Sequence, residues 1–104
     1  HWRPRVVGEL NGQQVKVVKF QGEFVWHAHA GEDELFLVLR GCFRMEFRDR
    51  SVTVHAGELI VVPRGVEHRP VADEEVEVLL FEPAATHHTG GVESPLTRHQ
   101  CERI

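Results

Sequence analysis

Residues 22–41 read GEFVWHAHAGEDELFLVLRG and bring together residue types that bind metals. His27 and His29 are two positions apart, and Glu34 follows five positions after His29. Side chains alternate across an extended chain, so the two imidazoles are predicted to project from one face. The polar stretch 30–33 is short enough to close a hairpin, which would return the Glu34 carboxylate opposite them. Two neutral imidazoles and a carboxylate around one point indicate a divalent metal site.

A second stretch, residues 57–68, reads GELIVVPRGVEH and offers a third imidazole. The short extended run ends at a Pro-x-Gly turn formed by Pro63 and Gly65, and His68 follows three positions later. We therefore predict His27, His29, Glu34 and His68 as the ligands of one divalent metal ion.

The first stretch resembles the first motif of the cupin superfamily, in which a glycine and a spacer precede His-x-His, then Glu, then Gly. Glu34 follows His29 after four residues, and Gly41 follows Glu34 after six, as in that motif. The spacer between Gly22 and His27 holds four residues, where five are usual.

The second stretch resembles the second cupin motif, with its two glycines, proline and histidine at the expected intervals. It departs from that motif at Ala72, where an asparagine often stands four positions after the histidine. Neither departure removes a predicted ligand. The resemblance spans roughly residues 15–82 and implies an all-β, double-stranded β-helix (jelly-roll) barrel.

The pattern along the chain agrees with many short strands separated by turns. Residues 42–47 alternate cleanly between apolar and polar, the Asn11-Gly12 pair is a hairpin signal, and residues 72–75 read as an acidic turn between two strands. We expect a single domain with a lead-in segment at 1–14, the barrel at 15–82 and a short irregular surface tail at 83–104.

Alternation also assigns inner and outer faces. If His27 and His29 face inward, Phe24 and Trp26 face outward, and Leu35, Leu37 and Leu39 lie outside if Glu34 is inside. This is more apolar surface than a small monomer exposes, so we predict a homodimer with Phe24 and Trp26 as interface candidates. The candidates for a pocket lining, which serve equally as plain core, are Phe36, Val38, Met45, Phe47, Ile60 and Val62.

Composition excludes several classes of function. The formal net charge is −4, from 12 basic and 16 acidic residues without a basic stripe, which argues against a nucleic-acid partner. No apolar run approaches the ~20 residues of a membrane span. With two cysteines, Cys42 and Cys101, and no visible export signal, reduced thiols and a cytoplasmic location are expected. The chain opens at His1 rather than Met, which leaves open whether residues precede it.

Several further polar residues have two readings. Glu32, Asp33 or Glu67 would orient a ligand histidine or simply carry loop charge. His55, on the polar side of residues 51–55, is expected to be exposed, as is the pair His87-His88. The role of Cys42 is left open.

The predicted cofactor is one divalent ion per chain, with Fe, Mn, Ni, Co or Zn as candidates. Three neutral imidazoles and one carboxylate leave such an ion at +1, which favours an anionic or chelating small molecule. In six-fold geometry two adjacent positions stay open, whereas a tetrahedral zinc would be saturated and structural.

Two functions follow from this site. One is a metal-dependent enzyme; the resemblance implies dioxygenase, isomerase, epimerase or lyase activity. Oxygen chemistry is favoured because no cluster of Arg and Lys is predicted inside the barrel to hold a phosphate. The alternative is a non-catalytic module that binds a metal or a small molecule.

Overall fold

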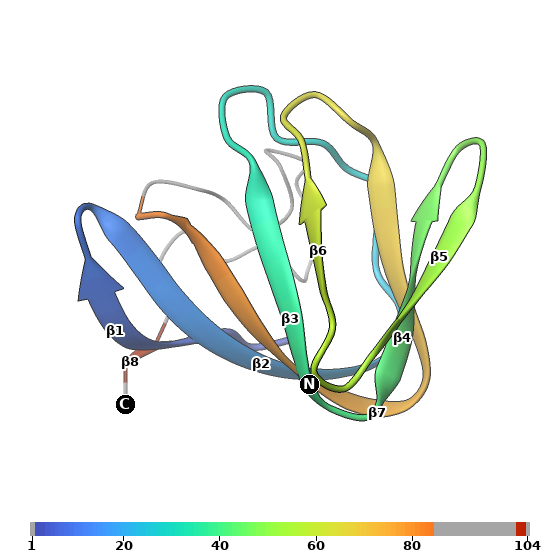
Figure 1. Ribbon diagram of the computed structural model, residues 1–104, viewed down its shortest axis with the longest axis horizontal. Helices are drawn as coiled ribbons and strands as arrows, with labels where there is room; N and C mark the ends of the chain where they lie inside the picture. The colour runs from blue at the N-terminus through green and yellow to red at the C-terminus, as the bar shows by residue number, and fades with distance from the viewer. Residues whose placement is uncertain (1, 85–101, 104) are drawn as a thin grey trace.

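The computed structural model describes residues 2–84 and 102–103. In these residues the chain forms eight β-strands and no helix, which confirms the predicted all-β class (Figure 1). No helix in this part of the chain has the length and apolarity that a membrane span requires. The strands are β1 (Arg5–Leu10), β2 (Gln13–Glu23), β3 (Glu34–Arg40), β4 (Cys42–Phe47), β5 (Ser51–His55), β6 (Leu59–Val62), β7 (His68–Pro83) and β8 (Glu102–Arg103).

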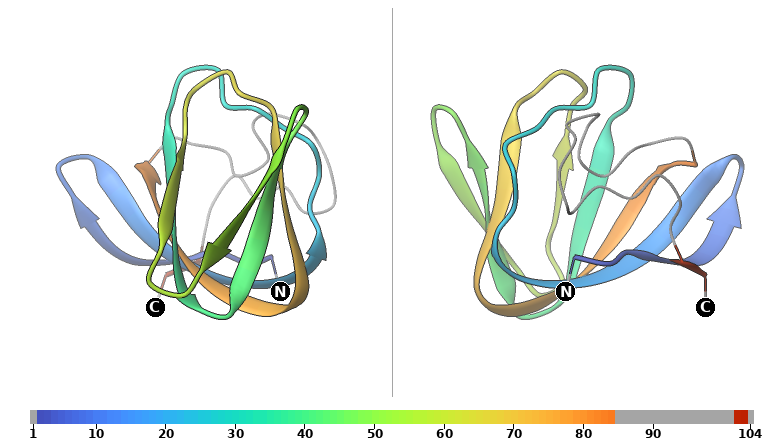
Figure 2. Two further views of the ribbon diagram at one scale, coloured as in Figure 1. Left: turned by 45° about the vertical axis from the view of Figure 1, so that its right-hand side comes forward. Right: turned by 180° about the vertical axis from the view of Figure 1, so that it is seen from behind.

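The long strand β7, of 16 residues, joins two layers into a jelly-roll barrel (Figures 1 and 2). Its first residues, 68–71, pair antiparallel with β4, which in turn pairs with β5. Its later residues, 77–81, pair with β3, whose other neighbour is β6. Strand β2 accompanies β7 over nearly its whole length, and β1 and β8 extend that layer beyond β2.

The acidic turn predicted at 72–75 is wrong, because β7 continues through it. Gly22 pairs with Ala72 and Phe20 pairs with Val76, so residues 73–75 of β7 stand opposite the single residue Gln21. The extra residues form an exposed bulge, and Gln21 Nε2 donates a hydrogen bond to the Asp73 carbonyl at 3.2 Å. Exposed carboxylates are compatible with a bulge as well as with a reversal, and the pairing with β2 decides between them.

The hairpin predicted at Asn11-Gly12 is confirmed. Both residues have positive φ, 50° and 79°, as a two-residue hairpin turn of this hand requires. The turn connects β1 to β2, so the segment 1–14 contributes a strand to the sheet. At the other end of the chain, β8 pairs parallel with β1, while His87-His88, Cys101 and most of the predicted tail lie outside the described residues.

The motif glycine Gly41 follows β3 at a point where a side chain would be crowded by the backbone of β7. Its φ is 86°, and a Cβ atom would lie 3.1 Å from the Glu75 carbonyl oxygen, which belongs to backbone. Gly57 has a similar φ of 82° with nothing within 4 Å of the same atom. An alanine at Gly57 would therefore suffer backbone strain alone, whereas an alanine at Gly41 would suffer the same strain and a close contact with backbone.

A Gly41→Ala variant is expected to be destabilised more than Gly57→Ala. Both substitutions place an L-residue in the left-handed region, at roughly 1–2 kcal/mol. Gly41→Ala adds overpacking against backbone, for about 1–3 kcal/mol more. Urea unfolding with a common slope measures the difference. Equal losses in the two variants would show that the contact with Glu75 relaxes freely.

The interior of the barrel is apolar at its centre. Strand alternation delivers one face of each strand to this core, and the clearest example is β4, where Phe43, Met45 and Phe47 are buried between partly exposed neighbours. The buried core cluster consists of Val18, Phe20, Phe36, Val38, Phe43, Met45, Phe47, Val54, Val62, Ala72, Val76, Val78 and Leu80.

Phe24 does not face outward, so its prediction as an interface residue is wrong. It is 7% exposed, and its ring stacks on Trp2 with centroids 4.7 Å apart. Residues 24–29 form no continuous strand; only His27 makes an isolated bridge, and two-residue alternation does not extend back to Phe24. Trp26 is half-buried beneath the Arg48 guanidinium, 3.9 Å from its ring centroid.

Candidate metal centre

Backbone pairing sets two of the histidines beside each other. His27 donates its N–H to the His68 carbonyl at 3.1 Å and accepts the His68 N–H at 2.9 Å. The Gly65 N–H then bonds the His29 carbonyl at 2.7 Å, so residues 24–29 run antiparallel to 65–70. The predicted hairpin between residues 24–29 and β3 is wrong: β3 pairs with β6 and β7, and Glu34 reaches the histidines as the first residue of β3.

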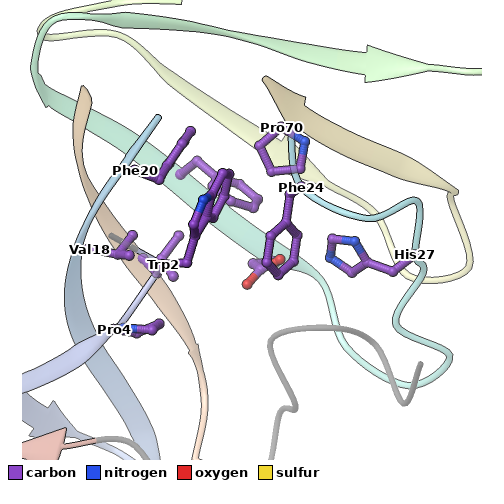
Figure 3. Close-up of a pocket in the computed structure, with 10 residues that line it drawn as sticks. Trp2, Pro4, Val18, Phe20, Phe24, His27 and Pro70 are labelled. Carbon is purple, nitrogen blue, oxygen red and sulfur yellow. The ribbon is translucent and has the colours of Figure 1, made fainter. Parts of the chain in front are cut away.

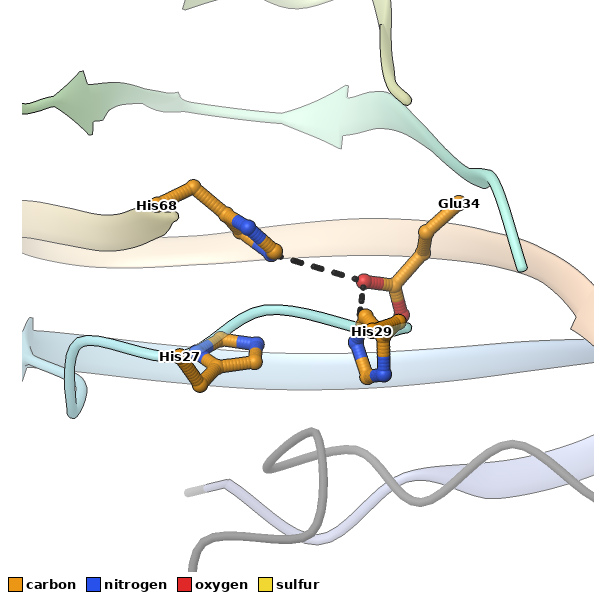
Figure 4. A group of neighbouring side chains, drawn as sticks. All are labelled: His27, His29, Glu34 and His68. Atoms are coloured by element: carbon orange, nitrogen blue, oxygen red, sulfur yellow. Dashed lines mark ion pairs between the residues drawn. The ribbon is translucent and has the colours of Figure 1, made fainter. Parts of the chain in front are cut away.

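The four side chains point toward one another (Figure 4). One ligand atom from each of His27, His29, Glu34 and His68 can be chosen so that all four lie within 4.8 Å of one another. All four residues are buried, with at most 5% of any one exposed. Burying a carboxylate among imidazoles is costly unless a compensating charge or hydrogen bond is present.

The donor atoms at this point lack ordinary partners. Glu34 Oε1 lies 3.2 Å from His29 Nε2 and 3.8 Å from His68 Nε2. None of these three buried atoms has a hydrogen-bond partner with acceptable geometry. Three converging lone pairs that satisfy no hydrogen bond are what a divalent cation would satisfy, so the residues present fit a metal ion.

Backbone carbonyls orient two of the rings. His27 Nδ1 lies 2.9 Å from the Val25 carbonyl, and His68 Nδ1 lies 2.9 Å from the Val66 carbonyl. A carbonyl only accepts, so each Nδ1 carries the proton and each Nε2 keeps its lone pair for a metal. In both histidines, a hydrogen bond from Nδ1 to the carbonyl two positions earlier in the chain thus fixes the tautomer that is protonated at Nδ1.

The acidic residues beside the motifs make other contacts. Asp33 accepts hydrogen bonds from the Arg64 backbone N–H at 2.9 Å and from its Nε at 3.3 Å. Glu67 accepts one from Arg48 at 3.3 Å. Both are exposed, and the carbonyls of Val25 and Val66 perform the orienting role that the sequence offered to these carboxylates.

The protonation states suit metal binding. Burial, assisted by the neighbouring His68, lowers the pKa of His27 to about 4, so its ring is neutral at pH 7. Burial alone would raise the pKa of the Glu34 carboxyl. The neighbouring Glu82, His29 and His68 side chains outweigh it and hold the pKa of Glu34 below its usual value, so Glu34 is an anion.

The lowered His27 pKa predicts that the metal-free protein loses stability as pH falls. Between pH 6.5 and about 4 the unfolded chain binds a proton at this residue that the folded chain does not, so unfolding is favoured as pH drops. The free energy of unfolding should lose about 3 kcal/mol over this interval through His27. Urea titrations from pH 7 to 4 should show a shallower fall in His27→Gln, whereas His55→Gln should match the wild type. An equal fall in His27→Gln would contradict the assignment.

A buried ion pair behind Glu34 was missed by the sequence reasoning. Lys16 Nζ lies 2.7 Å from Glu82 Oε1, and the two side chains are only 2% and 0% exposed. Burial, together with the neighbouring Glu34 carboxylate, raises the pKa of Glu82 well above its usual value. Strand alternation could have predicted that Lys16 is buried, because its side chain lies on the same face of β2 as the buried Val18 and Phe20.

An apolar cavity of about 40 Å³ lies beside the site (Figure 3). Trp2 stacks between Phe20 and Phe24, with centroid separations of 4.4 and 4.7 Å, and the Phe24 ring meets His27 edge-on at 5.4 Å. The lining residues are Trp2, Pro4, Val18, Phe20, Phe24, His27, Glu34, Phe36, Pro70 and Leu80.

Of the six residues offered as a pocket lining, Phe36 lines this cavity. Val38, Met45, Phe47 and Val62 belong to the core cluster, and Ile60 packs against it. His55 is exposed as expected, and Cys42 is a free, exposed cysteine. These last two side chains are separate from the site.

Comparison with known proteins decides the family. The family model described as "Cupin domain" matches residues 14–82, about two thirds of the chain. The chain belongs to the cupin family. Strand order and the position of the four converging side chains agree with the fold and motif resemblance drawn from the sequence alone.

Several solved structures are similar to this one. A cupin-2 domain containing protein from Shewanella frigidimarina is 52% identical, with a TM-score of 0.79 over 80% of this chain and 81% of that chain. Protein NMB1881 from Neisseria meningitidis is 32% identical, with a TM-score of 0.74 over 80% and 85%. KdgF from Halomonas sp. is 25% identical, with a TM-score of 0.66 over 77% and 78%.

A curated relative is similar over a shorter stretch. The YdbB protein of Bacillus subtilis is 38% identical over 64 residues, which are 61% of this cupin and 57% of that protein. The matched stretch therefore spans less than two thirds of the relative's own length. The names of these relatives assign no reaction to this cupin.

Proposed function

We propose that this cupin holds one divalent metal ion through His27, His29, Glu34 and His68 and is a metal-dependent enzyme acting on a small chelating molecule. The observation that carries the proposal is the convergence of buried donor atoms, three of which have no hydrogen-bond partner. A bound ion would supply Lewis-acid chemistry or, if redox-active, oxygen chemistry.

The charge of the site selects its ligand. Glu34 contributes one negative charge and His27 is neutral, and with the other two imidazoles neutral a divalent ion is left at +1. An anionic oxygen of a chelating substrate is therefore favoured over a neutral or cationic group. Iron, manganese, nickel or cobalt in six-fold geometry would leave two positions for such a chelate, whereas tetrahedral zinc would leave none.

The cavity beside the site has mainly apolar walls, and its volume of about 40 Å³, far below the ~300 Å³ or more of a ligand pocket, makes it part of the wall of the site and not a substrate pocket. His27 and Glu34 are the polar side chains in the lining, and the other eight residues are apolar. Lys16, buried in the same barrel, is already paired with Glu82 at 2.7 Å, so it offers no phosphate-binding charge to the cavity. The apolar surroundings and the absence of a free cation in this lining support oxygen chemistry over isomerisation of a phosphorylated sugar.

The chain's own residues have distinct roles in this proposal. The Val25 and Val66 carbonyls fix two imidazoles, and Glu82 supports the Glu34 carboxylate. Trp2, Phe20 and Phe24 exclude water from the space next to His27. A dry wall beside a charged centre strengthens every electrostatic contact that a substrate makes there.

Metal content and anion binding test the proposal. The tag-free chain, purified without added metal, is expected to carry or take up about one divalent ion per chain. When loaded with cobalt(II), its visible spectrum should change on addition of azide, because open positions accept an anion. Zinc at full occupancy with no azide response after exchange would favour the non-catalytic alternative. No uptake of any divalent ion would overturn the proposed enzyme and leave a barrel that binds a small molecule without metal.

A further inference from the structure

Trp2 has a backbone conformation that a bulky residue adopts only under constraint. Its φ is 61°, in the left-handed region. Among the described residues, the other non-glycine residue with a positive φ is Asn11, which lies in a hairpin turn that requires it. Trp2 precedes β1 and belongs to no hairpin. A strained residue of this kind persists because its surroundings hold it, and such residues gather at ligand clamps and switches.

The Trp2 indole contacts a phenyl ring on each of its faces. It stacks on Phe20 at a centroid distance of 4.4 Å with 18° between the planes, and on Phe24 at 4.7 Å with 22°. Figure 3 shows the indole between the two phenyl rings, with His27 beyond Phe24. Stacked aromatic pairs attract each other beyond the effect of the apolar surface that they bury. We call the space between the Phe20 and Phe24 rings the aromatic slot.

The walls of the aromatic slot are supported by contacts other than the indole. Phe20 is 2% exposed and packs edge-on against Phe43 at a centroid distance of 5.6 Å. Phe24 meets His27 edge-on at 5.4 Å, and its backbone N–H donates a hydrogen bond to the Pro70 carbonyl at 3.0 Å. The slot would therefore keep its two facing walls if the indole left it.

Trp2 is attached to the barrel less firmly than these walls. Residues 2–4 belong to no strand, and Trp2 is partly exposed. Its backbone N–H donates a hydrogen bond to the Lys19 carbonyl at 2.8 Å. Pro4 has no N–H with which to continue this pairing. Release of Trp2 would relieve its strained backbone without unpairing a strand.

The apolar cavity beside the site adjoins the aromatic slot. Trp2 lines this cavity together with His27 and Glu34, and with the indole in place its volume is about 40 Å³. No ligand of ordinary size fits such a space. If the indole left, the slot and the cavity would form one continuous space that reaches two predicted metal ligands.

We propose that the aromatic slot binds a flat aromatic group of the molecule that reaches the metal centre, and that Trp2 is a displaceable plug that this group replaces. Both walls of the slot are apolar ring faces, and an indole already fits between them. The +1 charge expected at the metal centre selects an anionic oxygen on the same molecule. The ligand class is thus a flat aromatic acid. The choice of an acid rests on the proposed function, whereas the ring contact requires no metal.

Calorimetry of the metal-free chain with indole tests the aromatic slot apart from the metal. Trp2→Ala is expected to bind indole at least about tenfold more tightly than the wild type, because the wild type must first expel its plug. Trp26→Ala is the matched control. It removes the other tryptophan, which lies beneath Arg48 away from the slot, and should bind indole like the wild type.

Displacement is measured directly in the wild type with 5-fluorotryptophan in place of both tryptophans. The Trp26→Phe variant assigns the two fluorine resonances. Indole should move the Trp2 resonance toward its position in the urea-unfolded chain and leave the Trp26 resonance unchanged. This measurement decides alone if Trp2→Ala fails to fold by circular dichroism. A Trp2 resonance that does not move at the solubility limit of indole would overturn the proposal, because Trp2 would then be a fixed wall. So would a folded Trp2→Ala variant that binds indole no better than the wild type.

The acid end of the ligand is tested with the metal-loaded chain. When the chain holds cobalt(II), it should bind indole-2-carboxylate at least about tenfold more tightly than indole, because the charged centre attracts the carboxylate. In the metal-free chain the order should reverse, since the Glu34 carboxylate repels the probe. Equal affinities in the loaded chain would overturn the assignment of an aromatic acid. A chain that binds no divalent ion but releases Trp2 to indole would overturn the proposed function and support the aromatic slot.

Discussion

A His68→Ala variant is expected to bind divalent metal at least about a hundredfold more weakly than the wild-type chain. Losing a residue that merely orients a ligand costs 10–100-fold in affinity as a rule, and loss of a direct ligand costs more. His68 is fully buried, and its Nε2 lies 3.8 Å from Glu34 Oε1. Alanine removes that lone pair and leaves three protein ligands. Metal content after purification and competition with a chelator measure the change.

His55→Ala is the matched control for this variant. His55 is the same residue type but lies exposed at the end of β5, apart from the site. It should retain about one metal ion per chain. Metal bound equally by His68→Ala and the wild type would remove His68 from the ligand set. Metal lost equally in His55→Ala would point to adventitious binding by surface histidines.

The convergence of the four predicted ligands could be expected from the sequence because its signal is local. Spacing within two short motifs identified four residues, and the structure brings the four side chains together. The strand alternation of Glu34 and its neighbours was also right, since Glu34, Phe36 and Val38 are buried while Leu39 is exposed. These features depend only on neighbouring residues and on the two-residue period of a strand.

The errors arose where pairing between distant segments decides the structure. Phe24 turned inward because residues 24–29 form no continuous strand, so the alternation counted back from His29 does not apply. Residues 73–75 looked like a turn, but the partner strand β2 holds them as a bulge. The orientation of Phe24 and the bulge at residues 73–75 cannot be predicted from the local sequence, because both depend on which strand lies alongside.

The burial of Lys16 and Glu82 shows a different limit of prediction from the sequence. Neither residue was singled out from the sequence, because a lone charged residue is rarely buried. They are buried because they pair with each other across 66 positions of sequence, Lys16 on β2 and Glu82 on β7. A charge that breaks an apolar inner face in each of two strands is a signal that can be sought in other chains.

A Lys16→Met variant is expected to be destabilised by about 3–5 kcal/mol, because it leaves a buried carboxyl without its partner. Glu82 Oε1 would lose its 2.7 Å contact, and Glu82 Oε2 already has no hydrogen-bond partner. Urea unfolding of the metal-free protein measures the loss. A change below about 1 kcal/mol would mean that the pair contributes no more than a solvated one.

The double variant Lys16→Met/Glu82→Met separates stability from metal binding. Replacing both partners of a buried pair by apolar side chains is often neutral, so most of the lost stability should return. Metal affinity should not return with it. Glu34 would lose the neighbouring Glu82 carboxyl that helps to hold its pKa low, and loss of such an outer partner weakens metal binding by about 10–100-fold. A double variant that recovers both properties would show that Glu82 fills space without supporting Glu34; one that recovers stability alone assigns Glu82 to the metal site.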